Sequence, residues 1–270
     1  NDTLRYCRIS GMTTGVSIGY CTATLSNNQF VNCGTAIYSD AFKRSPLIEG
    51  NTVDSCYSGI EIATTSYIGT PTVRGNTVNH CTYGLFFNAA YRSMVDDNVI
   101  SGNTYGVVVV GAAPVFHRNR IEDNSAFGVV SVDGANPRFG DNVIGDPGNN
   151  VIRNNPCQVL VTSSNPFFGL GLERPAGGWN SLYDNDNALP LVRAYWGSTV
   201  TAEWNWWGQD PPNKDQFFPN DSSYIDYENA LPTDPNQNTS PTRTPTSVAS
   251  GVFDGDPTPS LQSITPEQVQ

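Results

Sequence analysis

The apolar residues of the chain fall in short runs that alternate with polar residues and end at Gly or Asn. Ile48, Val53, Ile60 and Ile62 form such a series within one stretch of the sequence. This pattern is typical of short strands joined by tight turns, with one face of each strand buried. It predicts an all-β chain with almost no helix.

The strand pattern repeats in step with one polar position. An Asn, or Cys at the first occurrence, stands two residues before an apolar residue at Cys7, Asn28, Asn51, Asn76, Asn98, Asn119, Asn150, Asn180 and Asn205. We call these the anchor residues. The first five intervals are 21 to 25 residues, and the later ones are 31, 30 and 25 residues. A period of about 22 residues with several short strands has the size of one solenoid coil. We therefore predict about nine coils, stacked at about 4.8 Å per coil.

Stacked coils place equivalent residues in columns, so the anchor amides should hydrogen-bond from coil to coil at one bend. A second column lies five residues later, at Cys33, Cys56, Cys81, Asn103, Asn124 and Asn155. Its cysteines have two interpretations, a metal or disulfide site and a stack of buried thiols that replaces Asn. We favour the thiol stack because metal ligands converge on a point, whereas these residues form a column.

The chain changes character after the regular repeats. We expect regular coils over 1–162, irregular final coils with a C-terminal cap over 163–230, and a disordered tail or linker over 231–270, which is rich in Pro, Thr and Ser. All five tryptophans lie between Trp179 and Trp207. They are interpreted as the cap that covers the last coil, and the alternative is a platform for sugar rings.

Composition narrows the classes of partner. The net charge is −11, and Lys43 and Lys214 are the only lysines, so the chain offers no basic surface for nucleic acid. No run of eighteen apolar residues is present, so we expect no membrane span.

Several segments resemble a known family. They are PTVRGNTV at 71–78 and YGVVV at 105–109, with GWNSLY at 178–183 and AEWNWWG at 202–208. The first two resemble repeats of the right-handed parallel β-helix (pectate-lyase-like) superfamily, and the last two resemble the closing segment of bacterial secreted or surface β-helix proteins. The resemblance covers about residues 1–230. It implies a single-stranded right-handed parallel β-helix, an extracellular or cell-surface location, and tethering through a region beyond this sequence.

The best candidates for chemistry lie just before the anchors. They are Glu49, Arg74, Asp96 and His117, two residues before an anchor, and Asp97 and Arg118, one residue before. We call these six residues the charged stripe and expect it to be exposed on consecutive coils. In a lyase, Arg74 or His117 would be the base and Asp96 with Asp97 would hold calcium. In a hydrolase, Glu49 and Asp96 would lie about 9.6 Å apart, at the edge of the inverting separation.

A ladder of ion pairs explains the same charges without catalysis, and we favour it. Enzymes of the superfamily carry motifs that are missing here, namely Gly-His-Gly with paired Asp in polygalacturonases and Asp-Pro-His-Glu in alginate epimerases. Loop aromatics Phe42, Tyr67 and Tyr91, together with Asp97 and Arg118, are candidates for contact with a glycan. Asp184 and Asp186 are weak calcium candidates, since such clusters are more often turns.

These observations predict a secreted or cell-surface β-helix protein that binds carbohydrate or serves a structural or adhesive role. The alternative is a polysaccharide lyase or glycoside hydrolase acting on an extracellular polysaccharide, including one that contains uronic acid. We expect no cofactor apart from calcium, and the expected partner is a polysaccharide or surface glycan.

Overall fold

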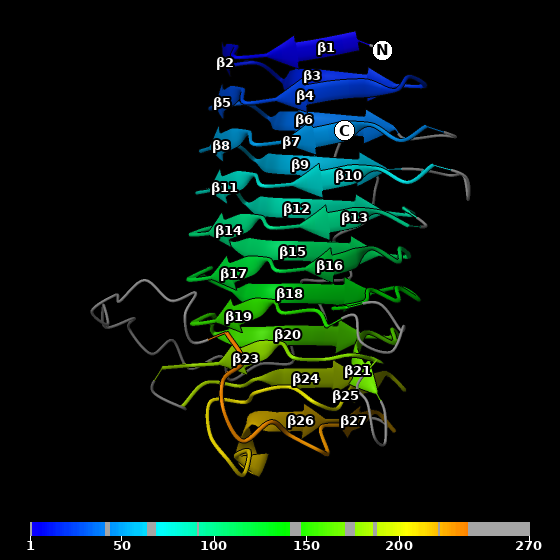
Figure 1. The fold of residues 1–270 in the computed structure, drawn as a ribbon, viewed down its shortest axis with the longest axis vertical. Coiled ribbons are helices and arrows are strands. Elements are labelled where there is room, and N and C mark those ends of the chain that lie inside the picture. Colours follow the sequence, from blue (N-terminus) through cyan, green and yellow to red (C-terminus); the bar gives the residue numbers. More distant parts are fainter. Residues whose placement is uncertain are drawn as a thin grey trace. The chain divides into compact units, whose positions relative to one another are not determined.

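The computed structural model describes residues 2–40, 44–63, 69–90, 92–140, 147–170, 176–185, 188–220 and 222–236. These residues form a parallel β-solenoid, in which each coil contributes strands to three parallel sheets (Figure 1). The all-β prediction is confirmed, because one 3-10 turn, η1 (Lys214–Gln216), is the only helical element in the described part of the chain. No described helix is long and apolar enough to cross a bilayer.

Three sheets make up the walls of the solenoid. Sheet A contains β1 (Asp2–Arg5), β4 (Ala23–Ser26), β7 (Leu47–Glu49), β10 (Thr72–Arg74), β13 (Met94–Asp96) and β16 (Val115–His117). Sheet B contains β2 (Arg8–Ser10), β5 (Gln29–Val31), β8 (Thr52–Asp54), β11 (Thr77–Asn79), β14 (Val99–Ser101), β17 (Arg120–Glu122), β19 (Val151–Arg153) and β23 (Ser181–Tyr183). Sheet C contains β3 (Thr14–Gly19), β6 (Thr35–Asp40), β9 (Ser58–Ala63), β12 (Tyr83–Asn88), β15 (Tyr105–Val110), β18 (Phe127–Val132), β20 (Cys157–Thr162), β24 (Val192–Tyr195) and β26 (Phe217–Pro219). Sheet C is nine-stranded, which confirms the predicted number of coils.

A fourth sheet continues the wall of sheet A beyond β16. It contains β21 (Phe167–Leu170), β22 (Ala176–Gly177), β25 (Thr199–Ala202) and β27 (Tyr224–Asp226). Single bridges join Arg138 to Val115 on one side and to Phe167 on the other, so the parallel stacking runs through the irregular coils.

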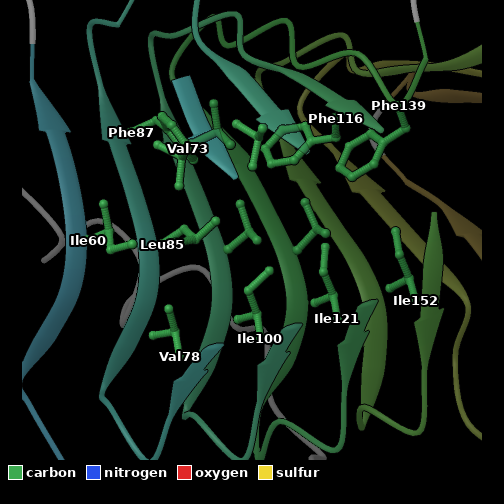
Figure 2. Packing of buried hydrophobic residues seen from close by; sticks show 14 of the residues in the cluster. Ile60, Val73, Val78, Leu85, Phe87, Ile100, Phe116, Ile121, Phe139 and Ile152 are labelled. Atoms are coloured by element: carbon green, nitrogen blue, oxygen red, sulfur yellow. The ribbon is translucent and has the colours of Figure 1, made fainter. Parts of the chain in front are cut away.

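Apolar side chains form columns inside the solenoid because strand pairing holds successive coils in register. Ile48 pairs with Val73, Val73 with Val95, and Val95 with Phe116. Rows of this kind fill the interior in Figure 2, where Ile100, Ile121 and Ile152 lie in one line. These core residues are fully buried, and a Phe column runs through Phe116, Phe139 and Phe168 with ring centroids 4.7 and 4.2 Å apart.

The anchor asparagines form the predicted ladder at the bend between sheets A and B. The Oδ1 atom of Asn119 accepts hydrogen bonds from the backbone N–H and the Nδ2 group of Asn98, at 3.0 and 2.9 Å. The same pattern runs from Asn28 to Asn180, and each anchor in that range is at most 1% exposed. Asn suits this column because one amide supplies both the donors and the acceptor that a buried bend needs.

The residue before each anchor turns the chain through the left-handed region. Its φ is positive before all nine anchors, at Tyr6, Asn27, Gly50, Gly75, Asp97, Arg118, Asn149, Trp179 and Trp204, and also at Asn229, the equivalent position after Trp204. We call this column the first bend. Gly, Asn and Asp tolerate this conformation best, which accounts for most of the residues found there.

Sheet C is apolar on both faces in its middle coils. Strand alternation turns Phe86, Val108, Val130 and Leu160 away from the core, yet none is more than 5% exposed. The continuous run Val107–Val110 in the sequence reflects this two-sided burial, because a strand with one wet face would alternate.

The predicted aromatic cap is present in part. Trp207 is fully buried and packs edge-on against Phe217, with ring centroids 5.0 Å apart, and Phe217 stacks on Tyr227. The chain remains attached after residue 230, since the side chain of Asn236 donates to the Trp179 carbonyl and to Ser181 Oγ. Residues 237–270, which include most of the predicted tail, lie outside the described residues.

Candidate functional site

The register of sheet A brings the charged stripe together. Glu49 pairs with Arg74, Arg74 with Asp96, and Asp96 with His117 as the last residues of β7, β10, β13 and β16. The preceding residue of each strand is fully buried in the core, so strand alternation points the four charged side chains outward. The sequence prediction placed these residues correctly in one column.

Arg74 forms the first ion pair of the stripe. Its Nε and Nη2 atoms both donate to Oε2 of Glu49, at 3.0 and 2.7 Å. The side chains are 53% and 31% exposed, so water screens the pair and its contribution to stability is about 0–1 kcal/mol.

His117 and Asp96 form the second pair, and here the expectation of an exposed stripe is wrong. His117 Nδ1 lies 3.1 Å from Asp96 Oδ1, and the two side chains are only 6% and 19% exposed. Val115, the other outward residue of β16, is buried as well. Strand alternation predicts the direction of a side chain but not what surrounds it, and this explains the difference.

Asp97 and Arg118 form the third pair, on the first bend. Arg118 Nε donates to Oδ1 of Asp97 at 2.8 Å and its Nη2 to Oδ2 at 3.0 Å. This two-pronged geometry fixes both side chains across adjacent coils, although each is about half exposed.

Pairing limits the chemistry of the stripe. Each of its three carboxylates lies against a cationic or imidazole partner from a neighbouring coil. A glycosidase acid is usually set in apolar surroundings, whereas Glu49 is partly exposed and hydrogen-bonded to Arg74. The stripe therefore has the geometry of an ion-pair ladder.

Most of the remaining predicted site residues fall in segments that the structure does not describe. Phe42, Tyr67, Tyr91 and Asp186 lie outside the described residues. Asp184 is buried, and its Oδ2 accepts hydrogen bonds from the backbone N–H groups of residues 188 and 189, at 3.1 and 3.3 Å. This is the role of a turn-forming aspartate. Among the described residues no three His, Cys, Asp or Glu side chains converge as metal ligands.

A second charged cluster, which the sequence prediction did not include, lies on the outer face of sheet B. Glu122 accepts from Arg153, with Nη2 2.7 Å from Oε2, and from Arg120 at 2.9 Å. Arg153 also donates to the Tyr183 hydroxyl at 3.0 Å. Glu122 and Arg153 are 8% and 7% exposed, so removal of either would leave a buried charge. These charged residues lie in strands that follow the anchors, whereas the sequence prediction considered only the strands before the anchors.

The cysteine column has the structure of a thiol stack. Cys33, Cys56 and Cys81 are buried, unpaired by disulfides, and follow one another in successive coils. The backbone N–H of Cys33 donates to Cys56 Sγ at 3.3 Å, and that of Cys81 donates to Asn103 Oδ1 at 2.9 Å. Sulfur therefore takes the acceptor role that the Asn amide has lower in the column. A hydrogen bond from Cys81 lowers the pKa of Cys56 below its ordinary value.

Comparison with known proteins gives one match. The family model described as "Right handed beta helix region" matches residues 14–168. No curated protein and no solved structure matches the chain.

Proposed function

Because the chain belongs to the right-handed β-helix family, we propose that it is an extracellular or cell-surface scaffold that binds a polysaccharide without cleaving it. The observation that carries this proposal is the pairing within the charged stripe, where Glu49, Asp96 and Asp97 each meet a partner on an adjacent coil. A long, regular outer surface suits a polymer that repeats along its length.

The test combines binding with a search for cleavage. Purified protein is run through native gels that contain different polysaccharides, and the same mixtures are assayed for reducing ends and for the ultraviolet absorbance of unsaturated products. We expect at least one glycan to retard the protein in the gel, with no cleavage product in either assay. Depolymerisation of any glycan would overturn it.

A polysaccharide lyase or glycoside hydrolase is the second candidate. The buried contact between His117 and Asp96 favours it, because a carboxylate that orients an imidazole is a common arrangement around a general base. Any lytic activity should then fall at least about a hundredfold in the double variant Arg74→Ala/His117→Ala. The matched control is Arg8→Ala, which removes an exposed arginine of β2 in sheet B, outside the charged stripe. Equal rates in the wild-type protein and the double variant would exclude the stripe as a catalytic site.

A further inference from the structure

The tryptophans of the C-terminal coils differ in exposure. Trp207 is fully buried in the cap, whereas Trp179 and Trp196 are 42% and 40% exposed. A residue that closes the end of the core should be buried, so the cap does not account for the exposed indoles.

Trp179 and Trp204 occupy the same position in consecutive coils. The backbone N–H of Trp179 donates to the carbonyl of Trp204, and their following residues, Asn180 and Asn205, are joined by the anchor ladder at 3.0 Å. Trp204 is half-buried beside its exposed neighbour. Parallel stacking therefore places the backbones of Trp179 and Trp204 about one coil spacing, about 4.8 Å, apart at the same bend.

The backbone at these two positions is unusual for a large aromatic residue. The φ angles of Trp179 and Trp204 are 58° and 60°, in the left-handed region, where most other coils have Gly, Asn or Asp. A bulky side chain costs free energy in this conformation, so backbone preference does not explain the choice of Trp. Both side chains nevertheless reach solvent, since Trp179 is 42% exposed and Trp204 is half-buried.

Resting on the proposed function, we infer that Trp179 and Trp204 form a platform for the pyranose rings of a neutral polysaccharide. Indole faces bind the apolar C–H face of a sugar, as they bind other flat partners. The rim of the platform carries hydrogen-bonding groups. Asn229, the exposed first-bend residue of the next coil, lies beside Trp204, and its Nδ2 donates to Glu203 Oε1 at 2.8 Å.

Charge selects a neutral glycan over a polyuronate. Residues 199–236 contain seven acidic residues and a single basic one, Lys214. A uronic-acid polymer bound along these final coils would meet like charges from this segment, which contains no Arg to bind its carboxylates.

The test replaces each indole with Asn, the residue that three other coils have at this bend and that tolerates the left-handed backbone. The variants are Trp179→Asn and Trp204→Asn. The matched control is Trp196→Asn, since Trp196 has the same residue type, a similar exposure and a φ of 57° at a different bend. Affinity gels contain cellulose derivatives, xylan, mannan or starch, with polygalacturonate as the anionic comparison.

We expect a neutral glycan to retard the wild-type protein, and added salt should not change this retardation. The affinity of Trp179→Asn for the same glycan should be lower by about tenfold. Trp196→Asn should bind as the wild type does. The glycan should also protect the tryptophan fluorescence of the wild-type protein from quenching by acrylamide. This protection should be smaller in Trp179→Asn. Thermal unfolding of Trp179→Asn and Trp196→Asn shows that both variants are folded.

The outcomes separate the platform from the proposed function. Glycan binding that survives both Trp179→Asn and Trp204→Asn would overturn the platform and leave the proposed function standing. Failure of the wild-type protein to bind any glycan would overturn both. A preference for polygalacturonate that weakens with salt would overturn the inference of a neutral ligand.

Discussion

Asn119 shows how much one side chain contributes to the coil stack. Its Nδ2 donates to the carbonyl of Val95 at 2.7 Å and to Oδ1 of Asn150 at 3.0 Å, and its Oδ1 accepts two bonds from Asn98. All of these groups are buried, so each bond that is lost leaves a polar atom without water.

We predict that Asn119→Ala lowers the free energy of unfolding by about 3 kcal/mol or more, because several buried donors and acceptors lose their partners together. Urea denaturation of the variant and the wild-type protein measures this change. The control is Gln29→Ala, which removes an exposed amide from β5 and should change stability by less than about 0.5 kcal/mol. Equal effects of the two substitutions would contradict the role of the ladder.

Glu61 gives a pH-dependent prediction at the residue scale. It points outward from β9 between Tyr38 and Phe86, is 8% exposed, and burial raises its pKa above the ordinary value of 4.5. The folded protein therefore holds this proton more tightly than the unfolded chain does. The stability that Glu61 contributes is present below pH 4.5 and is lost as the pH rises through its folded pKa.

Glu61→Gln should therefore be more stable than the wild-type protein at pH 7 and similar to it at pH 4. Urea midpoints at the two pH values provide the measurement, with Glu49→Gln as the control at an exposed, ion-paired carboxylate. A stability difference that does not depend on pH would show that Glu61 is not the titrating group.

At the scale of the element, a glycine column determines how closely the strands of sheet C stack. A Cβ added at Gly59, Gly84, Gly106 or Gly128 would lie 2.4 to 2.7 Å from a backbone carbonyl oxygen of the next coil. Backbone atoms at such distances cannot move aside without separating the coils. The Gly at the second position of β9, β12, β15 and β18 is thus required by close approach and not by φ.

Gly84→Ala should destabilise the protein by about 1–3 kcal/mol, as expected for overpacking against backbone. Gly19→Ala is the matched control, since it lies in β3, where an added Cβ meets nothing within 4 Å and φ is not positive. Thermal unfolding of both variants would test this, and a loss of stability in Gly19→Ala equal to that in Gly84→Ala would refute the explanation.

At the scale of the whole solenoid, stability depends on each coil having a neighbour on both sides. Trp207 and Phe217 cover the core below β24, and both are at least 93% buried. Loss of this cover should expose the last coils first, since their contacts run mainly to the coil above.

We predict that Trp207→Ala costs about 3–5 kcal/mol and increases hydrogen exchange in β24 and β26 before it affects β12 and β15. Hydrogen exchange read by mass spectrometry resolves these segments. Trp196→Asn, at an exposed indole, should leave the exchange pattern unchanged. Uniform loss of protection along the solenoid would argue against end-first unfolding.

The sequence by itself determined the repeat, because a buried amide is needed once per coil and cannot be exchanged for an apolar residue. It was therefore enough to predict the coils, the Asn and Cys columns, and the alignment of Glu49, Arg74, Asp96 and His117. Only the tertiary structure decided which side chains are covered. His117 is buried although its strand position faces outward, and Trp179 is exposed although its neighbours form a cap. The periodicity of a strand predicts whether a side chain points toward the core or away from it. The exposure of that side chain also depends on segments distant in the sequence, which a local pattern cannot predict.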